Sequence, residues 1–397
     1  MSFRHLCCAA IASSLTFTLS LTLTQNLAGQ EASPARTGTL STTAPAVFPL
    51  VLPTDNDALL RGDNASFYMY VDRIFENQVS TPWEGGGYGY VRGPVRNGAD
   101  MVLMAFHEGI DIAPTKRDAA GEPIDEVRAI SPGKVVHCSQ LAGASNYGRY
   151  IVIQHDLGEG SFFSLYAHLS KILVQPGQDV TMRTPIGIMG YTGSGLNQRR
   201  AHVHLEVNLM LSSRFDDWHA KNFRPSPNKH GNYNGINLSG VNVAQLYLEH
   251  QKNPALSLAD FIRKTEPVIK IVVPRKGELE ILKHYPWLGQ DVSASSPSPS
   301  WEITLGESGL PINVQTSALA VTQPQVSWVK DKGMPHGYYT RGYVAGSGEK
   351  GTLTASGLRF VELLTGDFVA PAPVPVAAEE KDSKKVKATM TTTSKKK

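Results

Sequence analysis

Cysteine is scarce in this chain, with three residues among 397. Cys7 and Cys8 lie in an apolar N-terminal run and would leave with it, so Cys138 would remain alone. A single cysteine excludes an intrachain disulfide, and no nucleophile motif surrounds Cys138. The hydrophobic fraction of 41% is nevertheless enough to build packed cores.

An excess of charge of one sign is also missing from the body of the chain. The net charge is +3, but residues 371–397 alone hold seven Lys and three acidic residues. Apart from this tail and Arg4, the chain is slightly negative. No basic face is present to bind a phosphate backbone, so we do not expect nucleic acid as a partner.

Residues 1–29 contain one Arg and one His, followed by an uncharged apolar run from residue 6 to residue 23. This pattern predicts a signal peptide, and an uncleaved membrane anchor is the alternative. Export across the inner membrane would place the protein in the periplasm or cell envelope. Residues 30–47 are rich in Ser, Thr, Ala and Pro, which predicts a linker.

The central feature of the sequence is the segment 201–209, Ala-His-Val-His-Leu-Glu-Val-Asn-Leu. Its alternation predicts a strand with His202, His204 and Glu206 on one face. Two imidazoles on one face can serve one metal ion or one reacting group. An ordinary half-buried strand, with its polar face in solvent, would give the same pattern. Glu206 fits either a group behind a metal ligand or a plain surface carboxylate.

A second pair of metal-ligand residue types occurs at His107 and Asp111. Gly109 and Pro114 argue against a helix here. Imidazole and carboxylate are usual zinc ligands, although a His and an Asp four residues apart also occur by coincidence on surfaces.

Between these motifs, short apolar segments alternate with turn residues, which predicts antiparallel β structure. The expected strands are residues 68–71, 101–106, 127–138 (two strands around a Pro-Gly turn), 150–155, 162–168, 172–174 and 186–189. The glycine-rich segments 85–89 and 190–195 are expected to be loops. Neither continues into the Gly-Lys-Ser/Thr ending of a phosphate loop.

Four motifs in order then carry a family resemblance. They are His-Glu-Gly-Ile-Asp-Ile at 107–112, Ala-Ile-Ser-Pro-Gly-Lys-Val at 129–135, Tyr-Ala-His-Leu at 166–169, and His-Val-His-Leu-Glu-Val at 202–207. Together they resemble the lysostaphin/LytM-type zinc metallopeptidases, which cut peptidoglycan peptides. The resemblance covers about residues 85–210.

The resemblance implies a role for five residues. His107, Asp111 and His204 would bind one Zn²⁺ per chain, while His168 and His202 would be catalytic. The partner would be peptidoglycan. Three departures from the family pattern concern loops: a longer segment 115–126, Ala201 in place of a common Pro, and a displaced Arg for which Arg92 is the nearest candidate.

The predicted organisation is a LytM-like antiparallel β metallopeptidase domain at 48–240, a helical connector at 241–265, and a smaller β-rich domain at 266–370. Residues 212–240 are expected to be a long loop or ordered extension, and 243–250 and 256–264 to be helical. The β-rich domain is expected to resemble a sandwich with strands at 268–273, 301–305, 326–329, 338–345 and 358–363. The Lys-rich tail 371–397 is expected to be disordered, and its charge favours anionic wall or membrane surfaces.

Two functions fit this sequence. The first is a secreted zinc endopeptidase that cuts peptidoglycan cross-links. The second is a catalytically silent wall-binding regulator, similar to amidase activators, that keeps the fold. The intact ligand and catalytic positions favour the enzyme.

Overall fold

The computed structural model describes residues 48–289 and 297–371, which belong to one compact unit. The predicted signal peptide (1–29), the predicted linker (30–47) and, from residue 372 onward, the predicted Lys-rich tail lie outside these residues. Within the described ranges, no helix has the length and apolar character that crossing a membrane requires. The structure is mainly β with antiparallel sheets, which confirms the expected fold class.

The largest sheet has seven strands, all paired in antiparallel fashion, in the order β11-β7-β8-β9-β13-β14, with β5 also paired to β13. Its strands are β5 (Ile110–Ile112), β7 (Gly133–Ser139), β8 (Tyr150–Asp156), β9 (Ser161–Ala167), β11 (Asp179–Val180), β13 (Val203–Met210) and β14 (Leu238–Gly240). The expected strands 150–155 and 162–168 correspond to β8 and β9.

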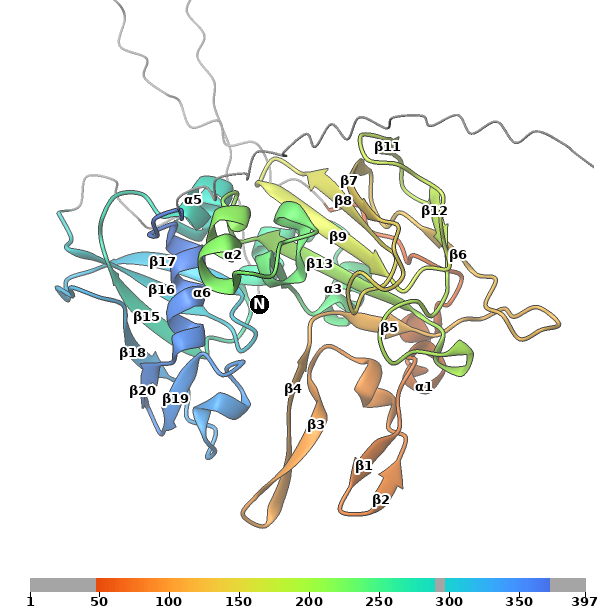
Figure 1. Cartoon of the computed structure of the whole chain (residues 1–397), viewed down its shortest axis with the longest axis horizontal. Helices are drawn as coiled ribbons and strands as arrows, with labels where there is room; N and C mark the ends of the chain where they lie inside the picture. Colours follow the sequence, from red (N-terminus) through yellow and green to blue (C-terminus); the bar gives the residue numbers. More distant parts are fainter. Residues whose placement is uncertain (1–47, 290–296, 372–397) are drawn as a thin grey trace, which may run out of the picture. The chain divides into compact units, whose positions relative to one another are not determined.

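Smaller antiparallel units surround this sheet. They are the sheet of β6 (Glu126–Arg128), β10 (Lys171–Ile172) and β12 (Pro185–Ile188), the hairpin of β1 (Arg73–Phe75) and β2 (Gln78–Ser80), and the hairpin of β3 (Gly89–Asn97) and β4 (Asp100–His107). Figure 1 shows the two hairpins extending in the same direction away from the large sheet.

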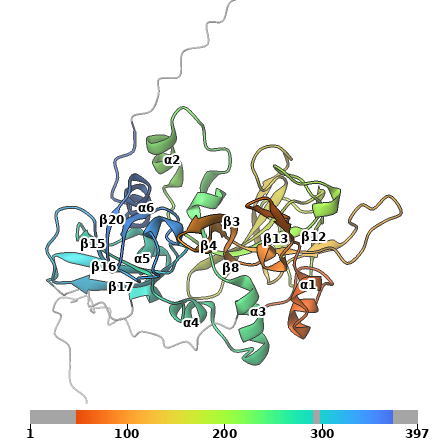
Figure 2. The ribbon, with the colours of Figure 1, turned by 90° about the horizontal axis from the view of Figure 1, so that it is seen from below.

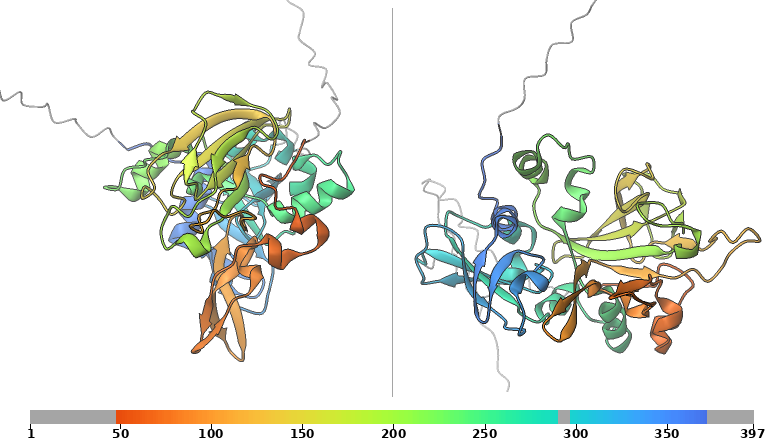
Figure 3. Two further views of the ribbon diagram at one scale, coloured as in Figure 1. Left: turned by 90° about the vertical axis from the view of Figure 1, so that its right-hand side faces the viewer. Right: turned by 60° about the horizontal axis from the view of Figure 1, so that its bottom comes forward.

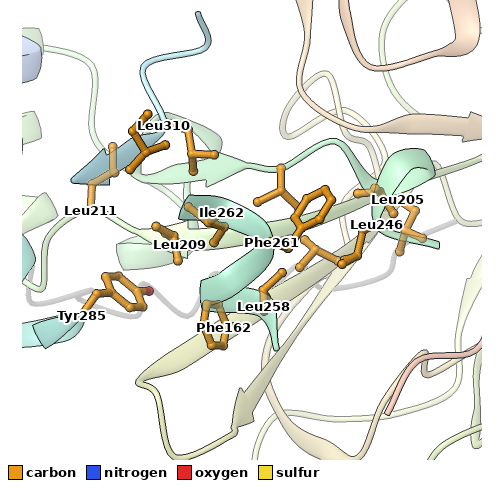
Figure 4. Packing of buried hydrophobic residues seen from close by; sticks show 14 of the residues in the cluster. Phe162, Leu205, Leu209, Leu211, Leu246, Leu258, Phe261, Ile262, Tyr285 and Leu310 are labelled. Carbon is orange, nitrogen blue, oxygen red and sulfur yellow. The ribbon is translucent and has the colours of Figure 1, made fainter. Parts of the chain in front are cut away.

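Strand β13 is buried along its whole length. The apolar face, which includes Leu205 and Leu209, packs under α3 (Val243–Lys252) and α4 (Leu258–Arg263), as Figure 4 shows. The other face carries His204, Glu206 and Asn208, and each of these side chains is buried too. The expected alternation is therefore present, and the alternative of an ordinary strand with its polar face in solvent is wrong.

Residues 68–71, expected to form a strand, do not form one. The chain there follows a short helix, α1 (Asn64–Phe67), whose start is capped because Asp63 accepts a hydrogen bond from the Ser66 backbone N–H. Only Tyr68 keeps a β-bridge, to Ile112. Figure 2 shows α1 next to α3.

The segment 212–240, expected as a loop or extension, contains the helix α2 (Phe215–Phe223). Phe215 and Trp218 are buried on its inner side, and the Trp218 indole N–H donates to the Arg359 carbonyl at 2.8 Å. Because the segment is mostly polar, its sequence did not indicate these buried contacts.

Short 3₁₀ turns occur throughout the described chain. They are η1 (Ala58–Arg61), η2 (Trp83–Gly86), η3 (Gln198–Arg200), η4 (Gly231–Tyr233), η5 (Gly235–Asn237), η6 (Pro286–Gly289) and η7 (His336–Tyr338).

The C-terminal residues form one four-stranded antiparallel sheet in the order β17-β16-β15-β18, not the expected sandwich. The elements are β15 (Ile269–Pro274), β16 (Ser300–Leu305), β17 (Pro311–Ser317), β18 (Gln325–Val329), the hairpin of β19 (Val344–Ser347) and β20 (Lys350–Leu353), and the helices α5 (Glu280–His284) and α6 (Ala355–Thr365).

Two expected C-terminal strands are wrong. Residues 338–345 form the end of η7, a turn and the start of β19. Residues 358–363 lie within α6, which Figure 3 shows beside the four-stranded sheet. Thr354 caps the start of α6 through the Gly357 N–H, and Gly366 ends it with a φ of 70°, so the helix carries both start and stop signals.

The hydrophobic core continues from the large sheet into the C-terminal residues. One cluster of buried side chains includes Leu209 and Leu211 together with Tyr285 and Leu310 (Figure 4). The domain boundaries near residues 240 and 265 stay a prediction.

Tyr285 links the two regions and gives a test of this shared core. Its hydroxyl accepts from the Met210 N–H and donates to the Ser161 carbonyl, both at 2.8 Å. Tyr285→Phe leaves both backbone groups without this partner, so we expect a loss of about 1–3 kcal/mol in the free energy of unfolding. Urea unfolding measures it. Tyr338→Phe is the control, because Tyr338 lies at the end of η7 and is only half-buried. Equal stability of the two variants would contradict the prediction.

Candidate metal centre

Strand pairing brings the three expected ligands together. His107 is the last residue of β4, Asp111 lies in β5, and His204 lies in β13. Strands β5 and β13 are antiparallel neighbours in which Asp111 lies opposite His204. All three side chains are buried. The register of two strands, rather than a loop, thus sets the distance between two of the three groups.

Hydrogen bonds on the outer side of the two imidazoles fix which nitrogen carries a proton. His107 Nδ1 lies 2.7 Å from the Gly87 carbonyl oxygen, and His204 Nε2 lies 2.8 Å from Glu206 Oε1. A carbonyl or carboxylate oxygen only accepts, so both of these nitrogens donate. In the neutral rings, the inner nitrogens His107 Nε2 and His204 Nδ1 then carry the lone pairs. Such outer partners are typical of metal-binding histidines.

The inner donor atoms converge on one point. His107 Nε2 and His204 Nδ1 are 3.0 Å apart, and they lie 3.1 and 2.9 Å from Asp111 Oδ1. Three lone-pair atoms this close repel one another unless a proton or a metal cation lies among them. Two imidazoles and one carboxylate are a donor set that zinc prefers, and three protein ligands leave a position for water. The residues present therefore fit a catalytic zinc ion.

The electrostatics of the site also favour a cation. Burial would lower the pKa of His204, but its hydrogen bonds to the Asp111 and Glu206 carboxylates raise it to about 10. Burial would raise the pKa of Asp111, but the adjacent His107 and His202 lower it well below its usual range. The carboxylates thus hold positive charge at this point, whether as a proton or as a metal ion.

The two expected catalytic histidines lie beside this point. The rings of His168 and His202 are 4.6 Å apart between centroids, and His202 Nε2 lies 3.3 Å from Asp111 Oδ1. Each ring donates its Nδ1–H to a backbone carbonyl at 2.8 Å, that of Thr192 for His168 and that of Arg200 for His202. The Nε2 atom of each ring therefore keeps a lone pair that can take a proton.

The backbone of His168 adopts a conformation that is uncommon for a residue other than glycine. Its φ is 64°, in the left-handed region. The His168 N–H donates to the Tyr147 carbonyl at 2.9 Å, and the Thr192 loop holds the ring. That loop packs closely, since a Cβ at Gly193 would lie 2.2 Å from the Asn146 carbonyl oxygen. The glycine-rich loop at 190–195 thus serves to hold His168.

A buried network behind His204 includes a residue that the sequence did not indicate. Glu206 is only 1% exposed, so its alternative as a surface carboxylate is wrong. Besides His204, it accepts hydrogen bonds from the Tyr147 hydroxyl at 2.7 Å and from the Asn208 amide at 3.0 Å. Tyr147 comes from a loop without a motif, so only the fold reveals its contact.

Arg92, the candidate for the displaced family arginine, reaches the site. Its guanidinium pairs with Asp111 Oδ2 and donates through Nε to the Gly85 carbonyl at 2.8 Å. Asp111 therefore directs one oxygen toward the histidines and the other toward Arg92.

The other histidines of the described residues do not belong to the group that could hold a metal ion. His155 is buried in the large sheet, where its two nitrogens contact the Pro132 carbonyl and Ser164 Oγ, each at 2.7 Å. Within the part of the chain that the structure describes, His107, Asp111 and His204 are the one group of His, Cys, Asp and Glu side chains arranged to hold a metal ion.

Residues 105–216 match the model of Peptidase family M23. This M23 region contains His107, Asp111, His168, His202 and His204, and it confirms the resemblance found in the sequence. Its first residue, 105, lies downstream of residue 85, where the resemblance begins. The segment that holds Gly87 and Arg92 is thus outside the matched M23 region.

Three curated relatives match part of this chain. An uncharacterized metalloprotease of Buchnera aphidicola subsp. Baizongia pistaciae is 38% identical over 26% of this chain and 23% of its own length. A Lipoprotein NlpD/LppB homolog of Pseudomonas aeruginosa is 33% identical over 26% of this chain and 29% of its own. The peptidoglycan DD-endopeptidase ShyA of Vibrio cholerae is 40% identical over 17% of this chain and 14% of its own.

The chain thus spans less than a third of the length of these relatives. Among solved structures, the catalytic domain of lysostaphin from Staphylococcus simulans is 28% identical over 30% of this chain and 75% of that one, with a TM-score of 0.22.

Proposed function

We propose that this protein is a zinc-dependent endopeptidase of the bacterial cell envelope that hydrolyses the peptide cross-links of peptidoglycan. The observation that carries the proposal is the convergence of three buried donor atoms beside two further imidazoles, each of which donates its Nδ1–H to a backbone carbonyl. The M23 match and the relative named as a peptidoglycan endopeptidase support the reaction and the polymer. The signal peptide expected at residues 1–29 supports the location.

His107, Asp111 and His204 would hold the ion. A bound zinc ion supplies a Lewis acid that lowers the pKa of water toward neutrality and polarises a carbonyl group. His168 and His202 perform the proton transfers: with Nδ1 donating to a backbone carbonyl, each ring offers its Nε2 as a base, and one of the two takes the proton that the attacking water loses. The resulting imidazolium then stabilises the oxyanion and returns the proton to the leaving amine.

Positioning of these groups depends on the contacts behind them. Glu206 orients His204, the Gly87 carbonyl orients His107, and the Thr192 carbonyl orients His168. Because the orienting groups lie on strands and a tightly packed loop, the five side chains need little rearrangement to act. The basic tail after residue 371 would add attraction to an anionic wall or membrane surface.

The second candidate is a catalytically silent wall-binding regulator with a retained metal site. A relative named as a lipoprotein, with no activity in its name, is compatible with this function. The five side chains are all present in this chain, which favours the enzyme over the regulator.

Digestion of intact peptidoglycan tests the proposal. Zinc-loaded protein should release separated stem peptides with new amino groups and leave the glycan strands intact, as mass spectrometry of the products would show. His168→Ala is the matched control and should release no peptides. New reducing ends without new amino groups would mean that the polymer is right and the reaction wrong. Binding to the wall without any release of peptide would favour the regulator.

A further inference from the structure

The turn between the two ligands on β4 and β5 is held tightly from two sides. A Cβ added at Gly109 would lie 2.4 Å from the Leu205 carbonyl oxygen, so the turn lies directly against β13. A Cβ at Gly240 would lie 2.4 Å from the Glu108 carbonyl oxygen, so β14 lies against the turn as well. The backbone that joins His107 to Asp111 is therefore fixed by close packing.

A residue from the C-terminal part of the chain holds the same turn by its side chain. The Arg341 guanidinium forms an ion pair with Glu108 Oε1, and its Cζ lies 5.4 Å from the centroid of the Phe106 ring. The two charged side chains are 31% and 28% exposed, so water screens this pair only in part. Phe106, Glu108 and Arg341 thus form one contact next to His107.

The backbone of Arg341 is held in an unusual conformation. Its φ is 54°, in the left-handed region, which costs energy for a residue with a side chain. The Arg341 N–H donates to the Tyr90 hydroxyl at 2.6 Å, and this bond and the ion pair to Glu108 fix the residue. Strain of this kind persists only where surrounding contacts determine the conformation.

One further contact ties a C-terminal residue, Ser308, to the segment that enters the β3–β4 hairpin. The Tyr88 hydroxyl contacts the Gly240 carbonyl at 2.8 Å and Ser308 Oγ at 3.2 Å. In the β3–β4 hairpin, Gly89 lies opposite His107 and Tyr90 lies opposite Phe106. The C-terminal residues therefore contact the part of the hairpin that presents His107.

We propose that Arg341 is a positioning residue: its ion pair with Glu108 fixes the turn from His107 to Asp111 and thereby strengthens metal binding. This inference rests on the metal site of the proposed function. It assigns the C-terminal residues a role in building the metal centre.

A purely electrostatic effect and a positioning effect predict opposite changes in metal affinity when Arg341 is replaced. This difference provides the test. Removing the positive charge of Arg341 should strengthen the binding of a cation, and removing the negative charge of Glu108 should weaken it. If the pair acts by positioning, Arg341→Met and Glu108→Gln should both weaken metal binding. The double variant should then be no worse than either single one, because both substitutions break the same contact.

The experiment measures release of Zn²⁺ from the full chain to a chromogenic chelator. Loss of a group that orients a metal ligand typically costs 10- to 100-fold in affinity, and for this contact one step further out we expect release to be about 3- to 10-fold faster. The visible spectrum of the Co²⁺-loaded protein should also change, because it reports on ligand geometry, whereas a purely structural contact would leave it unaltered. Arg341→Lys keeps the positive charge but replaces the planar guanidinium by an ammonium group, so it should release zinc at an intermediate rate.

Arg96→Met is the matched control, because Arg96 forms an exposed ion pair with Glu76 on the hairpins. It should release zinc at the rate of the unaltered protein. Opposite effects of Arg341→Met and Glu108→Gln that cancel in the double variant would overturn the positioning role and leave the proposed function standing. A protein that binds no zinc before any substitution would overturn both.

Discussion

Replacing either His204 or Asp111 by alanine is expected to remove the metal and the peptidase activity together. Each residue contributes one of three donor atoms that lie 2.9–3.1 Å apart, and the ligands available in the folded chain set the affinity of such a site. Purified protein should contain about one zinc per chain, and each variant close to none. Metal analysis of protein dialysed against a weak chelator provides the measurement, alongside hydrolysis of peptidoglycan.

The control for this result is His250→Ala, which removes an imidazole of α3 outside the metal centre. It should keep both zinc and activity. Thermal unfolding of each variant separates loss of the ion from loss of the fold. Full zinc content in both His204→Ala and Asp111→Ala would contradict the assignment of these residues as metal ligands, even if the activity of both variants were lost.

The side chains that the structure brings together at the candidate site could be named from the sequence, because their residue types are distinctive and their spacing follows strand geometry. His202 and His204 share a face because they are two residues apart on a strand, and this holds in any sheet. The pairing of Asp111 with His204 is a matter of register, which local sequence does not state. The order of the motifs supplied that missing information through the family resemblance.

The contacts behind the site could not be predicted in the same way. Tyr147 lies in a loop without periodicity, and Arg341 lies 233 positions from Glu108 in the chain. Only the folded chain brings such residues to Glu206 and to the turn at Glu108. Their side chains also have several plausible surface roles, so their residue types do not single them out.

In the C-terminal part, the errors arose from short apolar segments. Residues 358–363 contain apolar side chains that fit a strand or a helix equally over so short a length. Thr354 caps the start of α6 and Gly366 ends it, and these two residues are the sequence signals that favour a helix over a strand here. The four-stranded sheet is then packed with a helix where a second sheet was expected.

Replacing His168 should have a different effect from replacing a ligand: the metal should stay and turnover should fall. His168 Nδ1 is bound to the Thr192 carbonyl, and its ring lies 4.6 Å from that of His202, so it is placed to move protons rather than to hold the ion. Loss of a general acid–base group typically reduces turnover by about 10²–10⁴-fold. We therefore expect His168→Ala to keep about one zinc per chain and to lose kcat by this factor, with KM little changed.

The left-handed backbone at this position requires a second variant, because alanine is strained at a φ of 64°. Asparagine tolerates this region better than most residues, so His168→Asn should match the stability of the unaltered protein more closely than His168→Ala while losing the same turnover. A kcat that follows stability across the two variants would point to a structural role for His168. Release of zinc by His168→Asn, with the fold intact by circular dichroism, would show that His168 is itself a ligand and that the division of the histidines is wrong.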